Sequence, residues 1–442
     1  MSMKCLIIAA GKGRRLRQQG DSKPLVPILG RPLIERVIRS AIEAGADDFY
    51  VVTGYQEGRI RAFLAALTGH LGCRITPIFN RDWEKENGLS VLKAREYLKE
   101  PFLLLMADHL FDPAIARELM ALPLSDGEIA LGVDRNTRNS CIDMEDVTRV
   151  KTNGGKILNI GKDLTDFNGF DTGIFKCTSA IFSVLECSAK QNGDTTLSAA
   201  VQMLAGAGKA KAVEINGSFW IDVDDPAAFN RAEDVILTNL KDKTNDGPVA
   251  RYINRPLSVM ISRRLVNHRI TPNQISLFSF LCSVVAAGLF ALDGYLALLL
   301  GGFVAQFASI VDGCDGEVAR LTYQSSPYGG WFDAVLDRYA DAFLLFGLMW
   351  HAYADRTDGL ILLIGFLAII GSFMLSYTAD KHDSLMRDRI SHGKGLRLGR
   401  DIRVFLIFLG AVFNQAYLAL IVLAAVMNIE TIRRLIICRD HG

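Results

Sequence analysis

The sequence predicts an α/β domain with a Rossmann-like, mostly parallel sheet, followed by an all-α transmembrane domain of six helices. Two observations carry this prediction. Up to about residue 245, short apolar runs alternate with amphipathic segments, as they do in α/β proteins. From Ile275 onward, long apolar stretches dominate. A polar stretch containing Gly-Pro lies between them, so we expect a first domain over 1–238, a linker over 239–252 and a membrane domain over 253–442.

Composition excludes several other classes. The 442-residue chain has a net charge of +1, which argues against a nucleic-acid-binding protein. Its eight cysteines form no CxxC pair, so we expect neither a zinc site nor a disulfide framework, as in a reducing cytosol. The opening "MSMKCLIIAAGKG" lacks the order of a signal peptide and reads as a buried first strand.

The first half contains the expected strands and helices in alternation. The strands are "FYVVTG", "ITPIFN", "FLLLM" and "EIALGV", and the helices are "PLIERVIRSAIEAG" and "LSVLKAREYLK". This alternation predicts a mostly parallel sheet with helices on both faces. The glycine-rich turn after the first strand is neither a Walker A loop nor a dinucleotide fingerprint, since the required Ser/Thr and third glycine are missing.

Six apolar segments in the second half are long enough to span or nearly span a bilayer. They are approximately Ile275–Leu292, Tyr295–Val311, Trp331–Ala354, Leu360–Thr378, Ile402–Asn414 and Tyr417–Ile429, the last continuing to about 437. Basic residues cluster before the first, between the fourth and fifth, and after the sixth, which predicts that both termini face the cytoplasm. Residues 253–270 mix apolar residues with arginines, as in an interfacial helix that Pro272 ends.

Four carboxylates lie at the ends of the second and third segments. Asp312 and Asp315 are three residues apart, and Asp333 and Asp337 are four apart, so each pair shares one helix face. Ionisable groups at membrane depth are costly unless they face a cavity or a cation. If the two helices are neighbours, the four carboxylates form a site for divalent metal and diphosphate.

The stretch Asp312-x-x-Asp315-Gly316-x-x-Ala319-Arg320, eight residues, then Gly329-x-x-x-Asp333-x-x-x-Asp337 resembles the CDP-alcohol phosphotransferase signature at every position. The resemblance implies transfer of a phosphoalcohol from a CDP-alcohol to a hydroxyl, with release of CMP. It implies that the aspartates form the metal cluster, with Asp312, Asp315 and Asp333 as the main ligands and Asp337 as the base. Gly316, Ala319, Arg320 and Gly329 would shape the nucleotide pocket.

Four basic residues are candidates for binding a phosphate on the acceptor, because arginine forks match phosphate oxygens. They are Lys381, Arg400, Arg403 and Arg433. Members of this family that use inositol phosphate carry basic residues at roughly these places. The alternative is that they are cytoplasmic anchors of the helices.

In the first half, "AAGKGRRL" followed by "SKPLVPILGRPLIERVI" resembles the sugar-nucleotide pyrophosphorylase family of nucleotidyltransferases. In such a loop, around Ala10, Gly11 and Gly13, backbone N–H groups bind the triphosphate oxygens. Arg15 and Lys23 add positive charge that would offset the charge of the phosphates. "EKENGLS", with Glu86, Asn87, Gly88 and Ser90, resembles the subgroup that uses CTP and a small phosphoalcohol.

The same resemblance implies the rest of this site. Asp108, Asp222 and Asp224 would hold the metal, and Lys162, Asp171 and Gly173 would contact the polyol. A helix cap is the alternative for Asp222, and an ordinary strand end is the alternative for Asp108.

Together the two halves resemble the family in which inositol-1-phosphate cytidylyltransferase is fused to CDP-inositol:inositol-1-phosphate transferase, which makes di-myo-inositol phosphate phosphate, a compatible-solute precursor. The resemblance implies Mg²⁺, or Mn²⁺ in its place, in both domains; CTP, inositol-1-phosphate and CDP-inositol as ligands; and a homodimer in the cell membrane. The residues alone do not select inositol. Another polyol or a lipid acceptor stays open, as does a remote third possibility, a non-catalytic scaffold or transporter with a nucleotide sensor.

Overall fold

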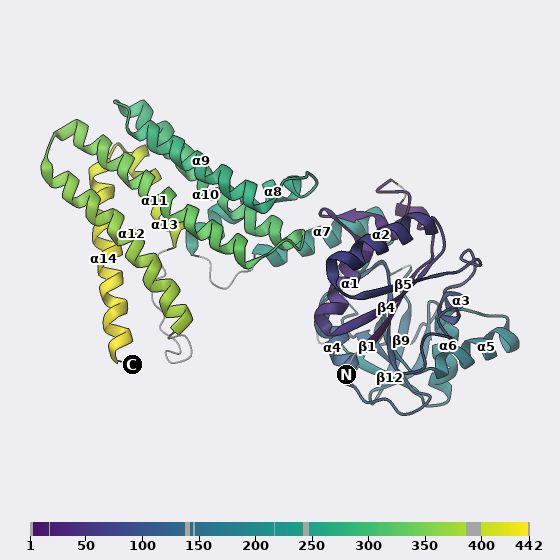
Figure 1. The fold of residues 1–442 in the computed structure, drawn as a ribbon. Helices are drawn as coiled ribbons and strands as arrows, with labels where there is room; N and C mark the ends of the chain where they lie inside the picture. The colour runs from purple at the N-terminus through teal and green to yellow at the C-terminus, as the bar shows by residue number, and fades with distance from the viewer. Residues whose placement is uncertain are drawn as a thin grey trace. The chain divides into compact units, whose positions relative to one another are not determined.

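The computed structural model describes residues 3–16, 18–137, 142–144, 146–215, 217–241, 247–385 and 399–440. The chain divides into two compact units, residues 1–235 and 236–442, which are described separately below (Figure 1). The predicted linker, 239–252, begins inside a helix that ends at Lys241 and ends inside a helical turn over Ala250–Asn254. Its central residues, 242–246, lie outside the described ranges.

A nine-stranded sheet forms the centre of the first unit, in the order β5-β4-β1-β6-β11-β8-β12-β10-β9. The strands are β1 Met3–Ala9, β4 Ala46–Thr53, β5 Arg74–Phe79, β6 Phe102–Met106, β8 Ile129–Asp134, β9 Arg149–Asn153, β10 Lys156–Gly161, β11 Gly169–Cys177 and β12 Ala210–Glu214. Two short antiparallel pairs accompany it, namely β2 Pro27–Ile28 with β3 Arg31–Pro32, and β7 His109–Phe111 with β13 Trp220–Asp222.

The sheet is mixed: the prediction of a mostly parallel sheet holds for its first four strands and for the pair β8–β12. It is wrong for β10 and β11, which run antiparallel to each of their neighbours. Strands β5, β4, β1 and β6 are parallel, as expected. Strand β11 runs antiparallel to both β6 and β8. The reason lies in the hairpin formed by β9 and β10, which reverses the direction of the chain. Strand β11 keeps the direction of β10, since both strands are antiparallel to β9.

Helices cover both faces of the sheet (Figure 1). Helices α1 Leu33–Ala44 and α4 Pro113–Ala121 contact each other and one face; α3 Asn87–Leu92, α5 Ala180–Asn192 and α6 Leu197–Gly206 pack against the other; α2 Glu57–Leu71 lies beside β5, and α7 spans Pro226–Lys241. Alternate residues of the central strands, such as Leu6, Val52 and Leu104, are fully buried in one apolar cluster.

Helix α3 is shorter than the helix predicted over "LSVLKAREYLK". It ends at Leu92, and the backbone continues in turns that tighten to i→i−3 hydrogen bonds at Ala94, Arg95 and Tyr97. Three apolar residues of the predicted helix, Val91, Ala94 and Leu98, are nevertheless fully buried, which explains the helical pattern in the sequence.

The second unit is helical throughout the part that the structure describes. Its helices are α8 Arg255–Leu265, α9 Pro272–Phe290, α10 Tyr295–Leu321, α11 Pro327–Arg356, α12 Gly359–Leu385, α13 Arg400–Val412 and α14 Ala416–Asp440. Helix α9 packs on α10 and α11, α10 also packs on α8 and α13, and α12 packs on α11 and α14. A helix therefore lies at each predicted span and at the predicted interfacial segment.

Three of these helices are long and apolar enough to cross a bilayer by length and composition: α9, α10 and α12 over Gly359–Lys381. Helices α10 and α11 extend beyond their predicted apolar cores, so the four signature carboxylates lie inside regular helix. Pro272 is the first residue of α9, where Thr271 and Gln274 form a capping box. The proline thus starts a helix as well as separating it from α8.

Candidate active sites

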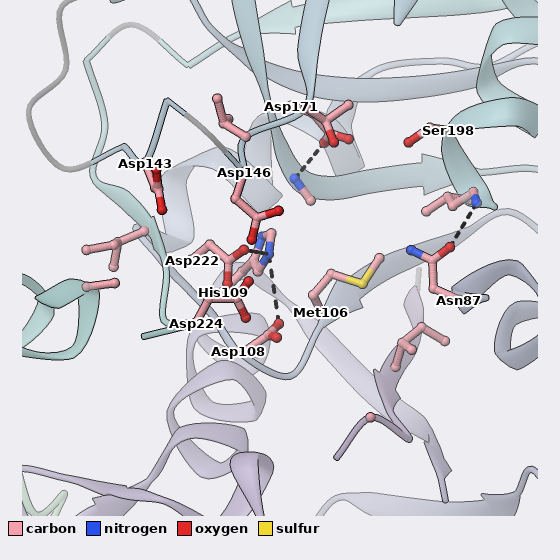
Figure 2. Close-up of a pocket in the computed structure, with 18 of the residues that line it drawn as sticks. Asn87, Met106, Asp108, His109, Asp143, Asp146, Asp171, Ser198, Asp222 and Asp224 are labelled. Atoms are coloured by element: carbon pink, nitrogen blue, oxygen red, sulfur yellow. Dashed lines mark hydrogen bonds and ion pairs between the residues drawn. The ribbon is translucent and has the colours of Figure 1, made fainter. Parts of the chain in front are cut away.

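The first unit contains a cavity of about 400 Å³ at the carboxyl ends of β1 and β6 (Figure 2). This is the edge at which parallel strands of α/β sheets present ligand-binding loops. Predicted site residues that line it are Ala10, Gly11, Arg15, Asn87, Asp108, Lys162, Asp171, Gly173, Asp222 and Asp224. The fold therefore brings together residues from Ala10 to Asp224, which lie far apart in the chain.

Lys23 lies at the centre of the acidic side of this cavity. Its ammonium group contacts the carboxylates of Asp108 and Asp224, and lies 3.8 Å from Asp222. The lysine is only 8% exposed. Gly13 has φ +60°, and a Cβ there would collide with the Lys23 side chain, so the glycine both makes the turn and gives the lysine its path.

His109 belongs to the same group, although the sequence analysis did not select it. Its Nε2 lies 3.3 Å from Asp222 and 3.8 Å from Asp108, and Nδ1 donates to the Thr172 carbonyl at 2.8 Å (Figure 2). Burial alone would lower the pKa of His109, but the charge and hydrogen bond of Asp222, with Asp108 and Thr172, raise it to about 9. The available signal was its place directly after Asp108.

The ligand atoms of Asp108, His109 and Asp222 all lie within 4.8 Å of one another, so this group can hold a divalent cation. Burial would raise the pKa of Asp222, but His109, Lys23 and Arg15 lower it to about 2. The helix-cap alternative is not what the structure has, because Asp225 accepts the hydrogen bond from Ala228 N at the start of α7.

Asp146, a second residue missed by sequence analysis, joins two of the predicted cations. Its carboxylate contacts Arg15 and lies 2.5 Å from Lys162 Nζ, while Arg15 also lies 2.8 Å from Asp224. These hydrogen bonds, that of Lys162 first, lower the pKa of Asp146. No motif marks it, since it stands in the acidic run Asp143–Asp146.

Of the predicted residues Glu86, Asn87 and Gly88, only Asn87 lines the cavity, and the other two contact Thr195. Asn87 lies across the cavity from the acidic group, with its Oδ1 accepting from Leu197 N at 2.9 Å (Figure 2). Glu86 does not line the cavity; its carboxylate accepts from both Thr195 N and Thr195 Oγ1 at 2.6 Å. Gly88 lets α3 approach the Thr195 carbonyl, where a Cβ would collide.

Two of the three residues predicted to contact the polyol, Asp171 and Gly173, lie beside His109. Asp171 is buried, which raises its pKa to about 6 against the hydrogen bond that its carboxylate accepts from Gly173 N at 2.7 Å. Gly173 has φ +72°, and a side chain there would collide with the imidazole of His109.

In the second unit, Asp312 of α10 and Asp333 and Asp337 of α11 bring their carboxylate oxygens within 4.8 Å of one another. Asp315 is outside this triad, and its Oδ2 accepts from Ser276 of α9 at 2.5 Å. The expected convergence of α10 and α11 carboxylates is thus present, with Asp337 inside the closest group. Such a group can hold a divalent cation.

Two predicted phosphate-binding arginines of α13 contact carboxylates of this cluster or of the next helical turn. Arg400 Nη1 lies 2.7 Å from both Asp312 and Asp337. Arg403 lies 2.8 Å from Asp341, a buried carboxylate one turn beyond Asp337. The i, i+4 spacing of Asp333, Asp337 and Asp341 was a signal that the sequence analysis did not use.

The other two predicted phosphate-binding residues have different surroundings. Arg433 is half-exposed and forms a bidentate pair with Glu430 of the same helix, at 2.7 Å for each contact. Lys381 is exposed, with Nζ 5.9 Å from the centre of the Tyr377 ring. Arg433 therefore has a partner that competes with a bound phosphate.

The small residues of the signature lie where the helices approach their ends. Gly316, Ala319 and Arg320 occupy the last turns of α10, and a Cβ on Gly316 would lie 3.1 Å from the Arg320 guanidinium. Gly329 donates its N–H to Ser326, the N-cap of α11, at 3.0 Å.

Two family descriptions match the chain. Residues 5–214 match a MobA-like NTP transferase domain, and residues 269–430 match a CDP-alcohol phosphatidyltransferase. The bifunctional IPC transferase and DIPP synthase of Rubrobacter xylanophilus is 36% identical over 97% of this chain and 95% of its own length. The protein of the same name from Aquifex aeolicus is 33% identical over 97% and 96%. The inositol-1-phosphate CTP transferase from T. maritima aligns with a TM-score of 0.48 and 27% identity, over 53% of this chain and 94% of that one.

The chain is an enzyme that joins a nucleotidyltransferase domain to a CDP-alcohol phosphotransferase domain. Its two acidic clusters lie in separate units. Because the similarity to both relatives runs through nearly the full length of each chain, the protein belongs to the family of bifunctional IPC transferases and DIPP synthases. Both resemblances inferred from the sequence motifs are confirmed.

Proposed function

We propose that the chain catalyses two consecutive transfers. In the first, CTP and inositol-1-phosphate give CDP-inositol and pyrophosphate. In the second, CDP-inositol and another inositol-1-phosphate give di-myo-inositol phosphate phosphate and CMP. The observation that carries this proposal is that each unit has its own group of cation-paired carboxylates, in a chain whose full-length relatives are bifunctional.

In the first reaction, a phosphate oxygen of inositol-1-phosphate attacks the α-phosphorus of CTP, and the bond to pyrophosphate breaks. Lys23 and Arg15 stabilise the charge that develops on the leaving pyrophosphate. Backbone N–H groups around Ala10, Gly11 and Gly13 bind the triphosphate, and Asn87 positions the nucleotide. Glu86 and Gly88 support the start of α3 through their contacts with Thr195. Lys162, Asp171 and Gly173 contact the inositol phosphate.

Asp108, Asp222 and Asp224 hold a divalent cation, Mg²⁺ or Mn²⁺, and His109 orients Asp222. These residues fit such a group, because Asp222 Oδ1 is buried and has no hydrogen-bond partner among the described residues. When bound, the cation offsets negative charge on the phosphates. Lys23 now shares two of these carboxylates, so binding of cation and triphosphate requires that the lysine turn toward the phosphate oxygens.

In the second reaction, a hydroxyl of the acceptor attacks the phosphorus of CDP-inositol that carries inositol, and the bond to CMP breaks. Asp337 takes the proton of that hydroxyl as general base. Asp312, Asp315 and Asp333 hold the divalent cations, and Asp333 Oδ1 fits this role because it is buried without a partner in the described part of the chain. Gly316, Ala319, Arg320 and Gly329 shape the nucleotide pocket.

Arg400 and Arg403, with Lys381 and Arg433, attract the phosphate of the acceptor. We further propose how the chain is placed in the cell membrane. Six helices, α9 to α14, cross it, and α8 lies on its surface. The first unit and both termini face the cytoplasm. We also propose a homodimer through the second unit.

The test uses purified full-length protein in detergent with labelled CTP and inositol-1-phosphate. Pyrophosphate release followed by CMP release, with a product carrying two inositols, is the expected result. Pyrophosphate release without CMP release until a lipid acceptor is added would identify a phospholipid synthase instead. Release of neither product would contradict both assignments.

A further inference from the structure

Asp341 lies outside the eight-position signature but is engaged on both of its oxygens. Oδ1 lies 3.3 Å from Arg400 Nε. Oδ2 lies 2.8 Å from Arg403 Nη1 and accepts from Ser372 Oγ at the same distance. The residue is 4% exposed. A buried carboxylate is retained only when its charge is paired and hydrogen-bonded, and here three groups on two other helices satisfy it.

Asp341 and the signature aspartates contact different nitrogens of the Arg400 guanidinium. Nε faces Asp341, while Nη1 lies 2.7 Å from Asp312 and from Asp337. Because a guanidinium is planar and rigid, holding Nε fixes the direction in which the remaining N–H groups point.

Ser372 and Arg403 in turn fix the carboxylate of Asp341. Ser372 Oγ, on α12, both donates to Asp341 and accepts from Arg403 Nη1 at 2.5 Å. Ser372 and Arg403 are 1% and 6% exposed. The carboxylate of Asp341 therefore cannot rotate without breaking a closed set of buried contacts, so it is a rigid support for Arg400.

We infer that Asp341 is a positioning residue, which holds Arg400 so that its Nη1 lies between Asp312 and Asp337. This inference rests on the proposed second reaction. Arg400 then meets the phosphate of the acceptor, or of the CDP-alcohol, at the position where the hydroxyl meets Asp337. Partners that orient a site residue are commonly worth 10- to 100-fold in activity.

The test is a double-mutant cycle in the full-length protein, with CMP release from supplied CDP-inositol and inositol-1-phosphate as the readout. Asp341→Asn should lower kcat by about 10- to 100-fold and change the KM for CDP-inositol only a few-fold. In an Arg400→Lys background, which lacks the fork that Asp341 holds, the same change should cost less than about 2-fold. Asp380→Asn is the matched control, since that carboxylate is 72% exposed and pairs with Arg338 at 3.3 Å.

Cytidylyl transfer by the same polypeptide reports whether each variant is intact. If Asp341→Asn costs the same factor in both backgrounds, Asp341 does not act through Arg400 and the inference is wrong. If that variant is not recovered folded, Ser372→Ala replaces it: a loss of a few-fold that disappears with Arg400→Lys supports the inference, and equal losses in both backgrounds overturn it. Failure of the unmodified protein to release CMP would contradict the second reaction itself.

Discussion

The ammonium group of Lys23 contacts the carboxylate of Asp108, although 85 positions separate them in the sequence. This ion pair joins the loop that follows the first strand to the end of β6. A second carboxylate, Asp224, meets the same lysine from the segment after β13. The lysine that we propose to bind phosphate thus lies among the carboxylates that we propose to bind metal. A bound metal would therefore replace the lysine as the partner of these carboxylates.

Lys23→Ala should lower cytidylyl transfer by about 100-fold or more while leaving transfer from supplied CDP-inositol intact. Removing one preorganised electrostatic contact to the transition state typically costs this much. Parallel assays of pyrophosphate and CMP release measure the two steps. Lys151→Ala, which removes a surface pair with Asp166, is the control. Equal loss in both steps would mean that Lys23 is structural.

A fragment that ends at Lys241, the last residue of α7, should be soluble and should make CDP-inositol from CTP. All residues proposed for the first reaction precede α7, and the helices that meet the criteria for crossing a bilayer begin at Pro272 or later within the described residues. Sedimentation and a pyrophosphate assay test this. An inactive or membrane-associated fragment would contradict the domain boundary.

His109 should stabilise this fragment more at low pH than at high pH when metal is chelated. Its pKa is raised in the folded state to about 9 from the ordinary histidine value of 6.5, so the stabilisation is fully present below about pH 6.5 and is lost as pH rises through about 9. The shift corresponds to a contribution on the order of 3 kcal/mol.

Urea unfolding at pH 6 and pH 10 measures this contribution as the difference between unmodified fragment and His109→Ala. The pH-independent cost of the cavity cancels in that comparison. His70→Ala provides the control, since His70 is exposed on α2 and its ring nitrogen bonds only to the Ala66 carbonyl among the contacts seen. A His109→Ala effect of equal size at both pH values would show that its charge does not contribute.

Asp337→Asn should remove most transfer from CDP-inositol, keep CDP-inositol binding within a few-fold and resist rescue by added Mg²⁺. A neutral amide cannot accept the hydroxyl proton, and general-base catalysis is commonly worth about 10²- to 10⁴-fold. Asp337 lies in the same carboxylate triad as Asp312 and Asp333, so it could also bind the metal. Its role as a base is therefore tested by comparison with a variant of a residue proposed to bind metal.

Asp312→Asn supplies that comparison. It should weaken metal and nucleotide binding, and raising Mg²⁺ should restore part of its activity. Binding of CDP-inositol, measured calorimetrically over a range of Mg²⁺ concentrations, distinguishes the two variants. If Asp337→Asn loses binding as severely as Asp312→Asn, Asp337 is a ligand and another residue is the base. Cytidylyl transfer should be unchanged in both.

The sequence by itself determined the division of the chain, the helix positions of the second half and the residues of both signatures. These features are local: apolar length, i, i+3 and i, i+4 spacing, and a glycine-rich turn after a strand are all readable without long-range contacts. The positions of Asp312 and Asp333 on helix faces needed nothing more. The parallel half of the sheet also followed from local alternation.

Only the tertiary structure decided which of these residues meet. The antiparallel insertion of β11 depends on its pairing with β6 and β8, which no local pattern encodes. Three residues were missed because their partners are distant in the sequence: His109, Asp146 and Asp341. The partners of the first two lie 63 and 131 positions away, and Asp341 pairs with Arg400 of another helix. A carboxylate or imidazole looks the same in a sequence whether it is solvated or buried between charges, because its chemistry is set by the neighbours that folding supplies.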